Sequence, residues 1–403
     1  MRILHVTPSV PKVRGGTSQA VLDMVRALQV NNVDAEIATT NDNGDALLNV
    51  PLQQRIEYQK APVWFFNRFS PTVKPVREYA FSWQLTQWLW QNMSQYDLVH
   101  VHALFSYPST IAMAIARLQN LPYIVSPHGL LCEWSLQQST RKKQIYLQLI
   151  EQANLNDCRG IHFTSEQEQQ EVSKLRLGVP SFVLPLGLSL PQQIPDARDK
   201  LRQCFNIPVD EPIILFLSRL HPKKGLDLLI SALSQLTHHR FTFILAGSGS
   251  PDYEAHIKSL LLSHGLSDRT RVAGFVEGES KSLLMQGADL FALTSYSENF
   301  GVAVLEALAA GIPVLITPGV ALASMVEQHK LGYVPQQDVS AIANALDNFM
   351  NSPQLAKQMG DRARQFVLEK YTWDKIAGQM IDSYRKILNK DTRYASTAKP
   401  SVF

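Results

Sequence analysis

The sequence predicts an α/β protein of two doubly wound domains, each built on a parallel sheet covered by helices on both faces. Short apolar, strand-like runs alternate with stretches of helical spacing along nearly all of its 403 residues. That length exceeds one typical domain. The proline-marked segment 191–195 separates two series of strands, so we expect domains at 1–190 and 191–371. A helix at 372–388 is expected to pack back on the first domain.

Each predicted strand is short, apolar and bounded by turn residues, and several are followed by a helical pattern. In the first series the strands are expected at 3–7, 35–39, 98–102, 123–126, 160–164 and 182–184. In the second series they are expected at 213–218, 241–246, 272–275, 290–294 and 313–316. Ligands of such sheets bind beyond the carboxyl ends of the strands, so the strand-to-helix turns are where site residues are expected.

Composition and charge exclude several classes of protein. The net charge is only +3 and the sequence has no long basic runs, so it does not predict the basic surface that binding of nucleic acid requires. The three cysteines are far apart and form no Cys-x-x-Cys pair, which favours the reducing cytoplasm. The apolar run at 2–6 is too short for a signal-peptide core, and the apolar region 301–326 is interrupted by Glu306 and Pro313. We expect a cytoplasmic protein without a membrane span.

The first informative turn, at 218–225, carries cations directly before a helix. Lys223 and Lys224 there oppose the positive end of the helix dipole unless an anion lies nearby. Arg219 in the same turn could bind phosphate oxygens as a fork while Lys224 adds a compact charge. A diphosphate site and a solvated basic loop both fit these residues.

The second turn joins the strand at 290–294 to a helix that should end at Gly311, before Pro313. Glu298 precedes this helix, and Glu306 lies within it in an almost wholly apolar stretch. A buried carboxylate is rare unless it is paired or faces a ligand. Glu306 therefore either contacts a ligand or has a structural partner such as Arg219.

These motifs together resemble the retaining, GT-B-fold glycosyltransferases of family 4, the bacterial polysaccharide-type group 1 glycosyltransferases. The resemblance implies two Rossmann-like domains that face each other across a cleft, with the nucleotide sugar bound by the second and the acceptor by the first. The motifs that carry it, in chain order, are Arg219 with Lys224-Gly225, Gly247-Ser248-Gly249, Gly274-Phe275-Val276, and Glu298 with Glu306 seven intervening residues later.

The resemblance also implies roles for residues of the second domain. Arg219 and Lys224 would bind the diphosphate, and Glu306 would bind the ribose hydroxyls. Glu298 and the amides after it would bind the donor sugar. Gly247 belongs to the same donor site. The backbone of Val276 would contact the nucleotide base. The alternative is that Val276 is an ordinary residue of the hydrophobic core. The amides are those of Asn299, Phe300 and Gly301, which have no intrahelical partner.

In the first domain the resemblance places two further features at the site. Gly15 and Gly16 would lie over the phosphates, where glycine permits close backbone approach. The alternative is an ordinary turn capped by Thr17 or Ser18. His128 would lie beside the reaction centre and act through its ring or carbonyl, although a lone histidine is usually structural. A third glycine at dinucleotide-fold spacing is missing, so a nicotinamide cofactor is not expected.

The sequence contains no Asp-x-Asp, the usual metal bridge to a diphosphate. We therefore expect metal-independent transfer, with Arg219 and Lys224 neutralising the leaving group. To retain the anomeric configuration of the sugar, the enzyme needs either a carboxylate nucleophile or an attack by the acceptor on the same face, in which the departing phosphate accepts the acceptor's proton. The resemblance favours the same-face route, with Glu298 as a positioning residue.

Residues 64–90 are unusually aromatic and include Arg68, Lys74 and Arg77. This mixture could lie at the inner face of the membrane near a lipid-linked acceptor. Apolar residues at helical spacing from Phe81 to Leu89 are equally typical of a helix packed on the sheet.

We therefore expect a hexosyltransferase that uses UDP-glucose first and GDP-mannose next. Its acceptor would be a saccharide or a lipid-linked sugar, in cell-surface or exopolysaccharide synthesis. Two alternatives are a nucleotide-sugar epimerase of the same fold and a non-catalytic, nucleotide-binding partner subunit. Glu298 and Glu306 argue against the second alternative.

Overall fold

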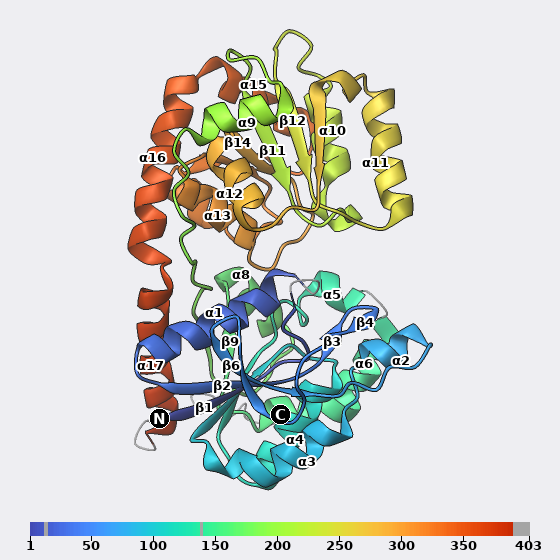
Figure 1. Cartoon of the computed structure of the whole chain (residues 1–403), viewed down its shortest axis with the longest axis vertical. Helices are drawn as coiled ribbons and strands as arrows, with labels where there is room; N and C mark the ends of the chain where they lie inside the picture. Colours follow the sequence, from blue (N-terminus) through green and yellow to red (C-terminus); the bar gives the residue numbers. More distant parts are fainter. Residues whose placement is uncertain (12–14, 138–139, 390–403) are drawn as a thin grey trace, which may run out of the picture. The chain divides into compact units, whose positions relative to one another are not determined.

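The computed structural model describes residues 1–11, 15–137 and 140–389 (Figure 1). The chain forms two compact units. Unit 1 comprises Met1–Gly187 and the segment that begins at Trp373, and unit 2 comprises Leu188–Thr372. The two crossings between the units lie side by side, because the amide of Leu188 donates to the carbonyl of Tyr371 at 2.7 Å. Gly187 is needed there, since a Cβ at this position would lie 2.4 Å from the Trp373 ring.

Unit 1 is built on an eight-stranded sheet in the order β10-β9-β8-β7-β1-β2-β6-β5. Its neighbouring strands are parallel except for the antiparallel pair β5 and β6. The strands are β1 (Arg2–Val6), β2 (Asp34–Thr40), β5 (Arg55–Tyr58), β6 (Ala61–Phe66), β7 (Leu98–His102), β8 (Tyr123–Ser126), β9 (Gly160–Phe163) and β10 (Ser181–Val183). A separate small ladder pairs β3 (Asp42–Asn43) with β4 (Ala46–Leu47).

Helices cover both faces of this sheet, with α1 and α17 on one side and α3 and α4 on the other (Figure 1). The helices are α1 (Gly16–Val30), α2 (Lys74–Glu78), α3 (Trp83–Asn92), α4 (Tyr107–Leu118), α5 (Glu133–Gln137), α6 (Thr140–Tyr146), α7 (Gln152–Asn156), α8 (Glu166–Ser173) and α17 (Trp373–Leu388). A π-helical turn at Leu147–Glu151 joins α6 to α7, and a 3₁₀ turn at Met93–Gln95 follows α3. The last helix thus belongs to unit 1, although the chain reaches it only after unit 2.

The two faces of the central strands differ in polarity because successive side chains of a strand point to opposite faces. On β7, Val99 and Val101 pack into an apolar core that includes Leu85 of α3. The alternate residues His100 and His102 face the other way, toward α17, and are fully buried. One face of the sheet is therefore a conventional core, and the other carries a row of buried polar side chains.

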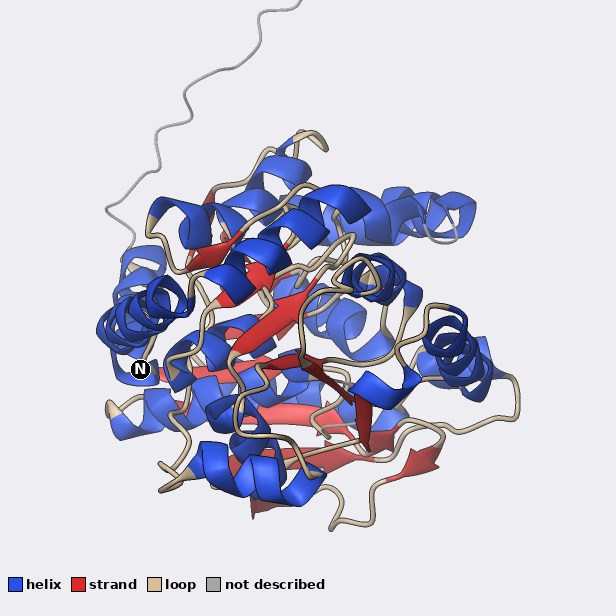
Figure 2. Ribbon diagram, turned by 90° about the horizontal axis from the view of Figure 1, so that it is seen from above, coloured by secondary structure: helices blue, strands red, loops and turns tan. Residues whose placement is uncertain are grey.

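Unit 2 is built on a six-stranded, wholly parallel sheet in the order β13-β12-β11-β14-β15-β16. In Figure 2 the strands of the molecule are flanked by helices, as expected of doubly wound sheets. The strands are β11 (Ile213–Leu217), β12 (Thr242–Ala246), β13 (Thr270–Gly274), β14 (Leu290–Leu293), β15 (Val314–Ile316) and β16 (Gly332–Tyr333).

The helices of unit 2 form two groups, in which α10 packs with α11 and α15, and α12 packs with α9 and α13. They are α9 (Ala197–Phe205), α10 (Leu226–Leu233), α11 (Pro251–Ser263), α12 (Gly278–Gly287), α13 (Val302–Ala310), α14 (Ala323–Gln328), α15 (Val339–Asn351) and α16 (Pro353–Lys370). Two 3₁₀ turns lie at Pro222–Lys224 and Ser267–Arg269.

All the strands that the sequence predicts are present, each displaced by at most two residues at either end. The parallel α/β architecture is therefore confirmed. The prediction missed β5 and β6 and the short strands β3, β4 and β16. The aromatic run that ends β6 does not alternate with polar residues, because β6 is buried on both faces.

Candidate active site

The loop after β11 carries both cations predicted to bind a diphosphate. Gly225, which ends the 3₁₀ turn at Pro222–Lys224, has a φ of 63°, and a Cβ there would lie 1.9 Å from the carbonyl oxygen of Thr294. The loop is thereby packed against the end of β14. Arg219 is exposed and forms no ion pair or hydrogen bond with another described residue. Its guanidinium therefore remains available to an anion.

Lys224 forms an ion pair with Glu298, whose side chains are 13% and 20% exposed. The backbone of Glu298 is fixed from both sides, since its amide donates to Gly319 at 2.7 Å and its carbonyl accepts from Ala321 at 3.0 Å. The structure thus brings together one of the two cations predicted to bind the diphosphate and the carboxylate predicted to bind the donor sugar.

Glu306 lies on α13, and one of its oxygens, Oε1, accepts a hydrogen bond from Lys281 of α12 at 2.5 Å. Glu306 therefore has a structural partner, as one of the two alternatives held, but this partner is Lys281 and not the suggested Arg219. The other oxygen, Oε2, is buried and has no partner among the described residues. A buried acceptor without a donor is costly, so Oε2 is suited to receive a hydroxyl from a ligand.

The helix signals around α13 are confirmed. Gly301 caps its N-terminus with a φ of 90°, and Gly311 ends it in the left-handed conformation with a φ of 84°. Asn299 and Phe300 lie in the loop before the helix, and the side chain of Phe300 is buried. Only the backbone of Phe300 could therefore face a ligand, as the prediction requires.

The ends of β11, β12 and β13 are tied together by glycine contacts. Gly247 has a φ of 132°, and a Cβ there would lie 1.8 Å from the carbonyl oxygen of Ser218. Its amide also donates to the carbonyl of Gly274 at 2.7 Å. Val276 lies in the next loop and is half-buried, so the alternative that it is plain core is wrong. The predicted strand end at residue 275 was also wrong, because β13 ends at Gly274 and Phe275 is exposed.

In unit 1, α1 begins at Gly16, and Gly15 precedes it with a φ of 99°. No side chain caps this helix. The alternative of a Thr17 or Ser18 cap is therefore wrong, and Ser18 instead donates to the carbonyl of Ser9 at 3.0 Å. Among the described residues no side chain caps the first amides of α1, and amides without an acceptor are the condition for anion binding at a helix N-terminus.

His128 follows β8 in a turn that is held on two sides. Its φ of 51° lies in the left-handed region, which histidine adopts more often than most residues other than glycine. Its Nε2 lies 3.0 Å from Nδ1 of His102, and the next amide, that of Gly129, donates to Glu168 of α8. His128 is half-buried. The histidine is thus presented by a rigid, internally bonded turn.

Three residues around these groups were not singled out from the sequence. Lys281 pairs with Glu306, Glu168 fixes the turn after His128, and His102 bonds to the His128 ring. For Lys281 and Glu168 the sequence offers no signal, since each looks like an ordinary polar residue of a surface helix. The alternation of His100 and His102 within an apolar strand was a usable signal, because polar residues at a spacing of two mark one face of the sheet.

The aromatic region at 64–90 is mostly structural. Leu85 and Leu89 of α3 are buried, which confirms this part of the packed helix face, whereas Phe81 precedes α3 and is exposed. Arg68 is not a surface cation, because it is buried and paired with Asp42. Arg77 is likewise largely buried and paired with Asp45, which leaves Lys74 as the exposed cation of the expected three. The electrostatic basis for a membrane surface here is correspondingly weaker.

The sequence also contains a short basic cluster at 141–143, which could either contact a phosphate of the acceptor or form a solvated helix face. The side chains of Arg141 and Lys142 lie outside the described residues. Lys143 is half-buried and donates to the carbonyl of Ser135 at 2.5 Å, so its ammonium is already engaged.

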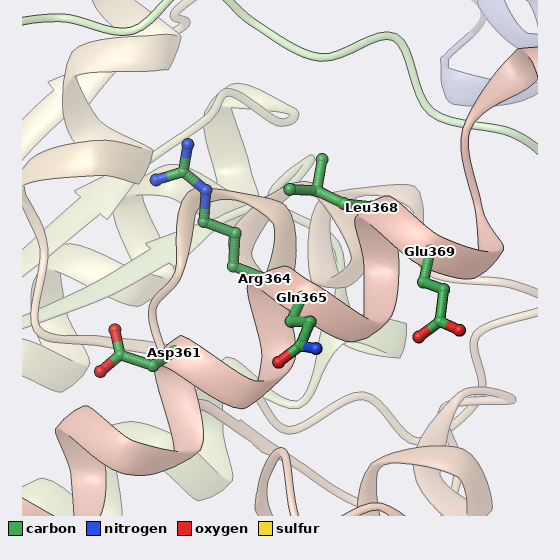
Figure 3. A pocket seen from close by; sticks show the side chains of 5 residues that line it. All are labelled: Asp361, Arg364, Gln365, Leu368 and Glu369. Carbon is green, nitrogen blue, oxygen red and sulfur yellow. The ribbon is translucent and has the colours of Figure 1, made fainter.

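A separate hollow lies along α16, far in sequence from the predicted site (Figure 3). Its lining residues recur every three or four positions on one helix, so they share a single helical face. They are Asp361, Arg364, Gln365, Leu368 and Glu369. None of the predicted site residues lines it.

Two family models match the chain, one in each unit. Residues 197–366 match the model described as glycosyl transferases group 1. Residues 15–187 match the model described as glycosyl transferase 4-like domain. Within the part of the chain that the structure describes, no helix is long and apolar enough to cross a membrane.

Relatives and solved structures agree with these models. The chain is 25% identical to a D-inositol 3-phosphate glycosyltransferase of Streptomyces scabiei, over 94% of this chain and 88% of that protein. It is also 25% identical to an uncharacterized glycosyltransferase of Methanocaldococcus jannaschii, over 73% of this chain and 76% of that one.

Among solved structures, sucrose-phosphate synthase of Thermosynechococcus elongatus superposes with a TM-score of 0.77 at 21% identity, covering 96% of this chain and 98% of that one. Anabaena HepE, solved in complex with UDP and glucose, superposes with a TM-score of 0.75 at 20% identity, covering 96% and 100%. The chain therefore has the same fold as these two proteins.

Proposed function

Because the chain belongs to the group 1 glycosyltransferases and has the GT-B fold, we propose that it transfers a hexose from a nucleotide diphosphate sugar with retained anomeric configuration and without a metal ion. The observation that carries the proposal is the arrangement of charges in unit 2. Lys224 lies against Glu298, Arg219 is exposed in the same loop, and Glu306 keeps one buried oxygen without a partner.

In the proposed reaction the bond between C1 of the sugar and the diphosphate oxygen breaks. A bond from C1 to the acceptor oxygen forms on the same face, and the departing phosphate takes the acceptor's proton. Arg219 and Lys224 would neutralise the charge that develops on the diphosphate, as preorganised cations do elsewhere. The pairing of Glu298 with Lys224 supports a positioning role for Glu298, since a carboxylate held by an ammonium is a weaker nucleophile.

Glu306 would bind the ribose through its unpaired Oε2, and Gly15 and Gly16 would cover the phosphates. Glu306→Ala should then weaken UDP binding by about 10- to 100-fold, the range of hydrogen bonds to a charged group. The same substitution should barely change binding of 2′,3′-dideoxy-UDP, which lacks both hydroxyls. Calorimetric titration of both nucleotides tests the assignment, and an equal loss for both would refute it.

UDP-glucose is the first donor to test, because the resemblance favours it and HepE is solved with UDP and glucose. GDP-mannose is the second. Labelled donor would be incubated with the protein with and without EDTA, and the products separated. Slow hydrolysis or transfer that EDTA leaves unchanged supports the proposal. An isomeric nucleotide sugar would instead indicate an epimerase, and loss of turnover in EDTA would refute metal independence.

We propose that unit 1 binds a saccharide or lipid-linked acceptor in cell-surface or exopolysaccharide synthesis, at a cytoplasmic location. Phe69, Val73, Val76 and Trp83 are exposed and lie near the exposed Lys74 in the sequence, which supports a peripheral contact with the inner face of the membrane. Sedimentation with vesicles that contain anionic lipid tests this contact. A Trp83→Ser variant should bind less, and equal binding of both proteins would contradict it.

A further inference from the structure

Unit 1 contains a set of buried histidines that neither the donor site nor the apolar core explains. They lie on one face of the sheet, the face covered by α17, because they occupy alternate positions of their strands. The strand register places them side by side, with His5 opposite His100 and His102 opposite Ser126. The histidines are His5 of β1, His100 and His102 of β7 and His162 of β9, and Ser126 of β8 lies among them; all five residues are fully buried.

The first of two hydrogen-bonded chains has a fixed direction, because it ends on a carbonyl. Nε2 of His162 lies 2.8 Å from the carbonyl oxygen of Leu184 and must donate to it. Nδ1 of His162 therefore accepts from Ser126 at 2.8 Å, and Ser126 accepts from Nε2 of His100 at 2.7 Å. Nδ1 of His100 then accepts from the hydroxyl of Tyr384 at 2.7 Å. Every group in this chain is satisfied.

The second chain leads to the candidate site. Nδ1 of His5 lies 2.9 Å from Nε2 of His102, and Nδ1 of His102 lies 3.0 Å from Nε2 of His128. At the inner end, Nε2 of His5 is buried without a partner among the described residues. At the outer end, Nδ1 of His128 has no partner among the described residues, and the residue as a whole is half-buried.

Only two directions are open to this chain. If protons point inward, Nε2 of His5 carries a hydrogen that has no acceptor. If protons point outward, Nε2 of His5 is a bare lone pair, and each histidine donates through Nδ1. Buried N–H groups without an acceptor are rarer than acceptors without a donor, so the outward direction is favoured.

We propose that His5 and His102 are positioning residues that hold His128 in its Nδ1–H tautomer, so that this N–H donates to an oxygen of the nucleotide sugar. The choice of ligand rests on the proposed function, whereas the tautomer does not. Burial, with a smaller effect of the neighbouring His162, lowers the pKa of both His5 and His128 to about 3. The histidines are therefore neutral at pH 7, and the tautomer decides whether His128 donates or accepts.

The same histidines do not form a convincing metal site. Ring nitrogens of His5, His100 and His102 lie within 4.8 Å of one another. Both nitrogens of His100 and both of His102 already have hydrogen-bond partners. Only Nε2 of His5 offers a vacant lone pair, and one ligand does not hold an ion.

Imidazole ¹⁵N NMR at pH 7 measures the tautomer directly on the full-length protein. Loss of one signal set in His128→Asn assigns the resonances. We expect a protonated-type shift at Nδ1 of His128 and an unprotonated-type shift at Nε2. The opposite pair of shifts would overturn the proposal, whatever the enzyme's activity proves to be.

Variants of His102 separate the hydrogen bond from packing. His102→Phe removes the donor to His128 and should mix its tautomers and lower kcat for sugar transfer about tenfold with little change in KM. In His102→Asn the amide nitrogen takes the place of Nδ1, so tautomer and kcat should be largely restored. His162→Phe is the matched control, since it removes an equally buried histidine that is not hydrogen-bonded to His128. It should leave the His128 shifts and kcat unchanged.

Either of two results contradicts the positioning role. One is an unaltered Nδ1–H tautomer of His128 in His102→Phe. The other is an equal disturbance of the His128 shifts by His162→Phe. Should His102→Phe not fold, the wild-type shifts and His102→Asn still decide the question. If the shifts follow the expectation but no sugar is transferred, the proposed function fails and the tautomer assignment stands.

Discussion

Two carboxylates of unit 2 are each held by one lysine, Glu298 by Lys224 and Glu306 by Lys281. The four side chains are only 13–31% exposed, and in such mostly buried pairs the cost of desolvating both charges offsets much of their attraction. Their value to the fold is therefore small. Such pairs can instead keep a carboxylate ionised and oriented while a ligand takes its remaining oxygen or shares its lysine.

We expect Lys224→Ala to weaken UDP binding by about 10- to 100-fold, because a charge-assisted hydrogen bond to phosphate is lost. The free energy of unfolding should change by less than about 1 kcal/mol. Isothermal titration and urea unfolding measure the two quantities. Lys223→Ala is the control, since it removes a cation from the same turn that is not placed at the diphosphate. Equal losses of UDP affinity in both variants would mean that the lysines act only through the overall positive charge of the loop, and that Lys224 does not contact the diphosphate.

Lys281 should act on the nucleotide only through Glu306. Lys281→Ala is expected to weaken UDP binding by about threefold to tenfold, because the Glu306 carboxylate loses its fixed orientation. In a Glu306→Ala background the same change should have almost no effect, since contacting residues are coupled. A double-mutant cycle of dissociation constants tests this coupling, and additive losses would show that Lys281 contacts the nucleotide by itself.

Helix contacts set opposite outcomes for two glycines. A Cβ at Gly360 of α16 would lie 2.1 Å from the carbonyl oxygen of Gly311, at the end of α13, whereas a Cβ at Gly378 of α17 would meet nothing within 4 Å. Gly360→Ala should therefore destabilise unit 2 by about 1–3 kcal/mol through overpacking. Gly378→Ala should stabilise unit 1 by about 0.5–1 kcal/mol through helix propensity. Thermal unfolding of both variants compares the signs.

The docking of α17 depends on one buried hydroxyl. Tyr384→Phe leaves Nδ1 of His100 without a donor, which costs about 1–3 kcal/mol. The thermal transition of unit 1 should fall by several degrees. Tyr333→Phe in unit 2 is a matched control, because its hydroxyl is buried without a partner, and its removal should be neutral or stabilising. A larger loss in Tyr333→Phe than in Tyr384→Phe would contradict this reading of the chain.

Across the whole molecule, the elements and the site were predictable to different degrees. Buried parallel strands are short, continuous apolar runs, so β7 and β8 could be predicted from local sequence. The helix α13 could also be predicted, because glycines mark both of its ends. Lys224 and Glu298 follow adjacent strands β11 and β14, whose carboxyl ends lie together. The pairs Lys281–Glu306 and His102–His128 join residues that are about 25 positions apart in the sequence. A local sequence pattern does not show which distant residues come into contact, so these pairs could not be predicted.

The buried histidines of unit 1 should make its stability fall as the pH falls. Burial lowers the pKa of His5 to about 3 and that of His162 to about 4, and it lowers the pKa of His100 and His102 well below 6.5. Between pH 6.5 and about 4 the unfolded chain therefore binds protons that the folded chain does not. The contribution of these histidines to the free energy of unfolding is therefore greatest above pH 6.5 and decreases as the pH falls below that value.

At pH 5.5 the loss should be about 1 kcal/mol for each such histidine. Urea unfolding of unit 1 at pH 7.5 and 5.5, followed through the transition that Tyr384→Phe lowers, measures the decline. Burial raises the pKa of Glu151, which acts in the opposite sense, but that contribution is common to all variants. His162→Gln keeps a donor for the Leu184 carbonyl and removes one titrating group, so its decline should be shallower by about 1 kcal/mol. Parallel curves for His162→Gln and the wild type would mean that the buried histidines take up protons in the folded state as readily as in the unfolded one.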